Sequence, residues 1–323
     1  MASDTSFNPG LGMQLRVMVT SFLVFGVIAG IIALIMWWTG IAGSGSILFW
    51  LAVSLAMVGV QWWLGPVIIK WATGAKELKR ESAPEIYEIV ERLARKANLP
   101  MPKLFVVNNP TPNAFAFGRT QKDSNIAVHS GILSVLNREE LEGVLAHEMG
   151  HINNRDVAVM TLASVLPVLL YYGVLIFAPR DRNEGIGGSI GVFIGAIVAQ
   201  FIGQLCVMWL SRQREYFADE FSAKLTGKPS SLMSALAKIS YGAAAGKPAE
   251  SGNMVRALYF AEPSGNKMNA AEIVGAIGSG NDAKLAEAIE NEKKKGGWEF
   301  LMTHPLTAKR LERLMTIKKG ITS

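Results

Sequence analysis

The chain has 323 residues, is 50% hydrophobic and carries a formal net charge of +6 at pH 7. Its single cysteine, Cys206, excludes an intrachain disulfide framework. The apolar residues are gathered in long blocks, so the basic excess indicates membrane topology and lipid headgroups rather than a nucleic-acid-binding surface. We therefore expect a protein of the lipid bilayer that binds no nucleic acid.

Four uncharged blocks predict four transmembrane helices. Residues 17–38 and 47–69 are each long enough to cross a bilayer, and a short Gly/Ser turn joins them into a hairpin. Residues 157–178 and 190–210 predict a second hairpin. A cleaved signal peptide is a poor alternative for the first block, because the block is too long and another span follows at once.

The polar segments divide the remaining chain into two parts. We expect a transmembrane hairpin at 1–70, polar parts at 71–156 and 211–323, and the second hairpin at 157–210. By the positive-inside rule, basic residues that follow the second and fourth spans place both polar parts in the cytoplasm of a multi-pass cell-membrane protein. These residues are Lys70, Lys76, Lys79, Arg80, Arg212 and Arg214.

The first polar part begins with a predicted helix. Ser82 and Glu85 have the spacing of a capping box, and an apolar stripe then continues to Ala97 before Pro100 ends the helix.

Three short runs at 104–107, 113–117 and 125–128 predict strands of a small sheet. Small and large side chains alternate along the second run, which suits an edge strand that accepts an extended peptide. A half-buried strand in an antiparallel sheet is equally compatible with these residues.

The sequence His147-Glu148-Met149-Gly150-His151 carries the chemistry. Asn137 and Glu140 resemble a capping box, and the apolar spacing that follows places the motif on a helix. Two imidazoles one turn apart can share a zinc ion, and the adjacent glutamate can take a proton from water. The motif arises by chance in roughly 1% of chains of this size, so its context has to support it.

A zinc site of this kind needs a third protein ligand. Glu215 and Asp219 lie one turn apart on a helix that is expected to continue out of the fourth span. One carboxylate can bind the metal while the other orients a ligand histidine, and the spacing alone does not assign the two roles.

These features occur together in a known order. The HEMGH motif is followed by Asn154 and Asp156, a membrane hairpin, REYFADEFSAKLTG, and finally Thr303-His304-Pro305-Leu306. This order resembles the HtpX-type membrane zinc metalloproteases, relatives of the CAAX prenyl proteases, over nearly the whole chain. The resemblance implies an α+β, mainly helical fold in which four transmembrane helices carry a cytoplasmic, gluzincin-like domain with a small β-sheet.

The resemblance also implies an activity and a set of site residues. One Zn²⁺ per chain would serve an endopeptidase that cleaves membrane or misfolded proteins in quality control and the stress response. Zinc would be bound by His147, His151 and Glu215. Glu148 would be the base, Asp219 would orient a ligand histidine, and Asn113, Ala114, Phe115 and Ala116 would bind substrate. His304 and Arg310 would steady the tetrahedral intermediate, whereas His129 is expected to be a polar group that binds no metal.

Other functions remain open from the sequence. A prenyl-protein endopeptidase would use the same residues. Intramembrane proteolysis is disfavoured because Glu139, Glu140 and Glu142 place the start of the motif's helix in water. A metal-stabilised membrane scaffold or chaperone without turnover is disfavoured by Glu148, since a structural zinc site would close its fourth position.

Overall fold

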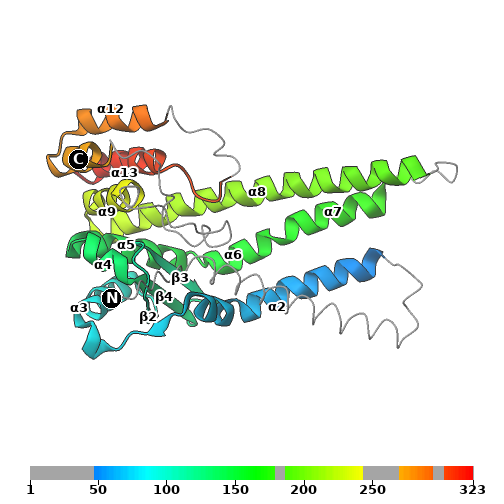
Figure 1. The fold of residues 1–323 in the computed structure, drawn as a ribbon, viewed down its shortest axis with the longest axis horizontal. Helices are drawn as coiled ribbons and strands as arrows, with labels where there is room; N and C mark the ends of the chain where they lie inside the picture. The colour runs from blue at the N-terminus through cyan, green and yellow to red at the C-terminus, as the bar shows by residue number, and fades with distance from the viewer. Residues whose placement is uncertain (1–46, 179–185, 243–268, 294–301, 323) are drawn as a thin grey trace, which may run out of the picture.

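The computed structural model describes residues 47–178, 186–242, 269–293 and 302–322. Long apolar helices extend to one side of a body made of shorter helices and a small sheet (Figure 1). The mainly helical α+β fold expected from the sequence is therefore confirmed. The first predicted span, 17–38, lies outside the described residues.

Three of the expected spans are helices long and apolar enough to cross a membrane. The first is α2 (Ile47–Thr73). The next joins α6 (Asp156–Ala163) to α7 (Val165–Phe177). The last is α8 (Ile186–Thr226), which continues unbroken for 41 residues, well beyond residue 210. The span and the segment carrying the two carboxylates are therefore one helix.

Small and polar residues connect the membrane helices. A Cβ at Gly203 on α8 would lie 2.8 Å from the Cα of Pro167, so only glycine allows this approach of α7 to α8. Ser54 on α2 shares a hydrogen bond of 3.2 Å with the hydroxyl of Tyr172 on α7. The hairpin of α7 and α8 therefore packs closely, and α2 is linked to it.

The sheet has four strands in the order β1-β2-β4-β3. They are β1 (Lys76–Glu77), β2 (Lys103–Val107), β3 (Ala114–Gly118) and β4 (Ser124–His129). Strands β2 and β4 are parallel, and the other two pairs are antiparallel. The three predicted strands are confirmed. Strand β3 lies at an edge of the sheet, which is the position that the peptide-accepting alternative needs.

Helix α3 (Pro84–Ala97) packs its apolar stripe into the core. Asn98 ends the helix in a left-handed conformation at φ 53°. The capping box expected at Ser82 is wrong. Ser82 belongs to a short 3₁₀ turn, so Ala83 becomes the N-cap and gives no side-chain hydrogen bond.

Helix α5 (Arg138–Asn153) carries the HEMGH motif and is largely buried. Its capping box is confirmed, because the Asn137 side chain accepts from the Glu140 amide and Glu140 accepts from the Asn137 amide, each at 2.9 Å. A Cβ at Gly150 would lie 2.9 Å from the Cα of Ala218, so glycine lets α5 cross α8 closely. This crossing brings the motif next to Glu215.

Helix α9 packs on α5 and on α8, α11 packs on α9, and α12 packs on α13. Helix α13 packs on both α8 and α9, which brings the C-terminal segment behind the crossing of α5 and α8. These elements are α4 (Ser130–Val135), α9 (Pro229–Ala237), the π-helical turn Lys238–Gly242, α11 (Asn269–Gly278), α12 (Asp282–Lys293) and α13 (Thr307–Thr322).

Candidate metal centre

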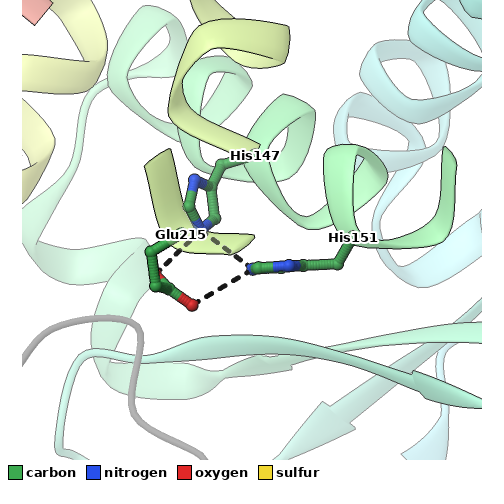
Figure 2. Close-up of side chains that lie close together, drawn as sticks. All are labelled: His147, His151 and Glu215. Atoms are coloured by element: carbon green, nitrogen blue, oxygen red, sulfur yellow. Dashed lines mark hydrogen bonds and ion pairs between the residues drawn. The ribbon is translucent and has the colours of Figure 1, made fainter. Parts of the chain in front are cut away.

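His147, His151 and Glu215 converge where α5 crosses α8 (Figure 2). The Nε2 atoms of the two histidines are 3.1 Å apart. Each Nε2 atom is also 3.5 Å from one carboxylate oxygen of Glu215. One potential ligand atom from each residue thus lies within 4.8 Å of the others.

Both histidines are held at their other ring nitrogen by an aspartate. His147 Nδ1 lies 2.9 Å from Asp219 Oδ1, and His151 Nδ1 lies 2.6 Å from Asp156 Oδ2. A carboxylate accepts a hydrogen bond, so each Nδ1 carries the proton and donates it. When each ring is neutral, the lone pair on its Nε2 is therefore directed toward the other histidine and Glu215.

This donor set fits a metal ion. Ligands about 2.0–2.1 Å from a tetrahedral zinc lie roughly 3.3–3.4 Å apart, close to the separations of 3.1 and 3.5 Å between these atoms. Glu215 Oε2 is also buried and forms no hydrogen bond among the described residues, although Arg310 Nη1 lies 3.1 Å away. A metal ion among the three side chains would add a direct ligand bond to this carboxylate.

A family model described as peptidase family M48 matches residues 80–318, which include all of these side chains. The chain belongs to peptidase family M48. Its relatives include a "Protease HtpX homolog" of Thermococcus sibiricus, 35% identical over 97% of this chain and 98% of the relative. Another, of Bifidobacterium longum, is 39% identical over 68% of this chain and 74% of the relative. The resemblance to HtpX-type proteases is thereby confirmed.

A solved structure supports the fold independently. The crystal structure of Ste24p from S. mikatae aligns with a TM-score of 0.58 at 16% identity, covering 94% of this chain and 66% of that one. Together with the three long apolar helices among the described residues, family membership makes this chain a membrane metallopeptidase.

Glu148, the expected base of this M48 chain, is buried beside the edge strand. Its Oε2 accepts a hydrogen bond of 2.7 Å from the backbone amide of Ala116 on β3. Burial raises the pKa of Glu148 above its usual value, against the opposing effect of the nearby histidines. A carboxylate with a raised pKa is a better proton acceptor and donor near neutral pH.

Strand β3 directs backbone groups away from the sheet. The Ala116 amide faces Glu148, so it points to the side of β3 opposite β4. Because amide and carbonyl directions repeat every second residue, Ala114 directs its backbone groups to the same outer side. Asn113 precedes the strand and is buried, and its carbonyl accepts from the His129 amide at 2.9 Å.

His304 and Arg310 approach Glu215 from different sides. His304 Nδ1 lies 3.3 Å from Glu215 Oε1, and His304 also lines a cavity next to the site. Arg310 is 1% exposed, and it donates to Asp219 through Nε at 2.8 Å and Nη2 at 2.6 Å. Its Nη1 lies 3.1 Å from Glu215 Oε2. Arg310 thus binds the two carboxylates from behind.

The two histidines of the cluster differ in their affinity for protons. Burial opposes a charge on His147, but hydrogen bonds to Asp219 and Glu215 raise its pKa to about 9. For His151, burial is the dominant effect and lowers the pKa. Without metal at neutral pH, His147 therefore carries a second ring proton, on Nε2, in addition to the Nδ1 proton that each histidine carries.

His129 lies outside the group formed by His147, His151 and Glu215, and its role as a polar group that binds no metal stays a prediction. Its Nδ1 is 3.0 Å from the carbonyl oxygen of Thr111, and burial lowers its pKa.

Sequence reasoning missed the role of Asp156, although the residue was part of the recognised pattern. Its carboxylate holds His151 and forms an ion pair with Arg214. An aspartate at a helix start soon after the second histidine is the signal that could have identified it.

A cavity of about 580 Å³ lies between the metal cluster and the membrane helices. Its walls include Trp62 and Pro66 of α2, Ala116 of β3, and Met160 of α6. His151, Glu215 and His304 form part of the same lining. The cluster is therefore reached through a cavity that apolar residues of the membrane helices help to form.

Proposed function

We propose that this M48 chain is a zinc endopeptidase in which His147, His151 and Glu215 bind the ion. The observation that supports this most is the convergence of two Nε2 lone pairs and a carboxylate at separations suited to a tetrahedral zinc. Three protein ligands leave a fourth position for water or substrate, which is the arrangement of catalytic rather than structural zinc.

A bound zinc ion supplies Lewis acidity, which acidifies water and polarises a carbonyl group. Glu148 accepts the proton of the attacking water and later delivers it to the amine that leaves. Its raised pKa suits both transfers. Hydrolysis then proceeds without a covalent bond between enzyme and substrate.

Substrate would be held on the outer side of β3. An extended peptide can add to this edge through the outward backbone groups of Ala114 and the carbonyl of Ala116, next to Asn113 and Phe115, while the Ala116 amide donates to Glu148. His304 lines the cavity, so it can donate to the oxygen on which negative charge develops. Arg310 is paired behind the ligands, so its contacts favour positioning of Asp219 and Glu215 over contact with substrate.

The cavity supports membrane or misfolded proteins as substrates. It is lined by Trp62 and Pro66 of a membrane helix as well as by the candidate catalytic residues. An unfolded apolar segment fits such a surface better than a folded, polar one does. This favours a role in protein quality control and the stress response.

Replacing Glu148 with glutamine tests the proposal. The amide keeps the shape of the side chain but cannot accept a proton, so Glu148→Gln is expected to bind one zinc and lose about 10²–10⁴-fold in hydrolysis of an unfolded protein. Zinc content and cleavage are measured on the same preparations.

Glu139→Gln is the matched control for that variant. Glu139 is an exposed residue of α5 that pairs with Lys228 at 2.6 Å, so its loss should leave cleavage unchanged. Full cleavage by Glu148→Gln would refute the role of Glu148, and absence of zinc from the unaltered protein would refute the metal assignment.

We also propose that the metal centre faces the cytoplasm of a four-span protein of the cell membrane. Basic residues follow α2 and the predicted end of the fourth span, as the positive-inside rule requires. Tags inserted at residue 100 and after residue 323 should both resist protease added to intact cells and be cut after lysis. Cleavage of either tag in intact cells would contradict this orientation.

A further inference from the structure

The two candidate ligand histidines are each backed by an aspartate and an arginine, but from different parts of the fold. Asp219 and Arg310, behind His147, come from the end of α8 and from α13. Asp156, behind His151, is the first residue of α6, where the third predicted span begins. The partner of Asp156 is Arg214, which precedes the ligand Glu215 on α8.

The contacts of Arg214 join three elements. Its guanidinium forms an ion pair with Asp156 Oδ1, while Asp156 Oδ2 accepts from His151. It also donates to the carbonyl oxygen of Asn154, the C-cap of α5, at 2.7 Å. One arginine on α8 therefore binds both the end of α5 and the start of α6.

The turn between α5 and α6 places Asp156 at His151. Arg155 has φ 56°, a left-handed conformation that residues with a Cβ adopt only at an energetic cost. The turn at this residue precedes Asp156, whose side chain contacts His151 on the preceding helix. The contacts of Arg214 and His151 with Asp156 are of the kind that can maintain such a turn.

From these contacts we propose that Asp156 and Arg214 are positioning residues for His151, so that metal affinity depends on how α6 is docked onto α8. The inference rests on the zinc site proposed above. Asp156 fixes the proton of His151 on Nδ1 and leaves Nε2 for the metal, and Arg214 fixes Asp156. Displacement of the first turn of α6 would release His151 even with all three ligands intact.

Zinc affinity of the full-length protein in lipid nanodiscs tests this, by competition with a chelator. Asp156→Asn is expected to keep one zinc per chain but to bind it about 10–100-fold more weakly. Arg214→Gln should weaken binding less than Asp156→Asn. The double variant should match Asp156→Asn alone, because both residues act through the same histidine.

Glu220→Gln is the matched control. Glu220 lies on α8 and pairs with Lys224 and Arg313, but it touches none of the candidate ligands. Like Asp156→Asn, the substitution Glu220→Gln removes one negative charge close to the site, but the zinc affinity of this variant should equal that of the unaltered protein. The absorption spectrum of bound Co²⁺ provides a second readout, since it reports the ligand geometry directly and needs no activity.

The outcomes separate the two proposals. If Asp156→Asn and Arg214→Gln bind zinc as tightly as the unaltered protein, with unchanged Co²⁺ spectra, the two residues serve only to pack α6 and the inference is overturned. If Asp156→Asn fails to fold, Arg214→Gln alone decides in the same way. If the unaltered protein binds no zinc, the proposed function fails and takes this inference with it.

Discussion

The two histidines of the candidate metal centre are both held in position by an aspartate, but their surroundings differ. The His147 side chain is 1% exposed and is held by residues of α8 and α13, far along the chain. The His151 side chain is 20% exposed, lines the cavity, and is held by a residue only five positions away. The first side is built by tertiary packing of the body, and the second by a local turn at the membrane helices.

The difference means that one histidine is held rigidly while the other stays accessible to substrate. A metal centre needs ligands that stay fixed while substrate enters, and enclosing both histidines fully would leave no approach. Here the buried side, with Arg310 behind it, provides the fixed part. The cavity side leaves His151 and the edge of β3 within reach of a peptide. Glu215 joins the two sides, because each histidine faces one of its oxygens.

Removing that shared residue should have the largest effect. Glu215→Ala leaves two histidines, which are expected to hold no stoichiometric zinc after dialysis, so hydrolysis should disappear with the metal. Asp219→Asn is the matched variant one turn further on, and it should retain zinc at about 10–100-fold lower affinity. Elemental analysis and chelator competition measure both. Full zinc in Glu215→Ala with loss in Asp219→Asn would reverse the two roles.

Breaking the buried side alone should mainly affect stability. Arg310→Gln removes the buried guanidinium that pairs with the carboxylates of Asp219 and Glu215, which is expected to cost about 3–5 kcal/mol in the free energy of unfolding of the metal-free protein. Denaturant unfolding in a mild detergent, followed by tryptophan fluorescence, measures the change.

Arg313→Gln is the control on the same helix. Arg313 is 41% exposed and pairs with Glu220 at 3.5 Å, so its loss should cost about 1 kcal/mol or less. Equal losses in the free energy of unfolding of the two variants would show that the buried ion pairs of Arg310 stabilise the fold no more than the exposed pair of Arg313 does.

The smallest expected effect is a dependence of zinc affinity on pH, because the two histidines differ in pKa. His147 has a pKa raised to about 9, so it is protonated in the metal-free protein at pH 7, whereas the pKa of His151 is lowered and it is neutral. Zinc binds only neutral imidazole and must displace this one proton. Affinity should therefore rise about tenfold per pH unit from 7 toward 9 and level off above that range.

Calorimetry in buffers of different ionisation enthalpy counts the protons released. One proton per zinc at pH 7 is expected. Release of no proton, or of two, would contradict the prediction that His147 is protonated and His151 is neutral at pH 7.

Much of the site could be predicted from sequence because local patterns encode it. The periodic spacing of apolar residues located α5, and the motif on it gave His147, Glu148 and His151 directly. The short run at 113–117 predicted strand β3, but the alternation of small and large side chains left two possibilities open, an edge strand that accepts a peptide or a half-buried strand. The capping box at Asn137 was correct because both partners lie within the first turn of the helix.

What the sequence could not provide depends on turns and on distant packing. The box expected at Ser82 failed because a 3₁₀ turn took up that residue and shifted the N-cap to Ala83. The contact of Asp156 with His151 depends on the left-handed conformation of Arg155, for which no residue pattern is diagnostic. The position of Arg310 depends on where α13 packs, 91 residues beyond the carboxylate that it binds.

The continuity of α8 has a consequence for where cleavage can occur. Glu215 follows residue 210, the predicted end of the span, by five positions, which is about 7–8 Å along a helix at 1.5 Å per residue. No turn or loop separates the two in this single 41-residue helix (Figure 1). For a span that ends at residue 210, we expect the proposed zinc site to lie close to the lipid headgroups, so that a substrate bond is cleaved where it reaches that level.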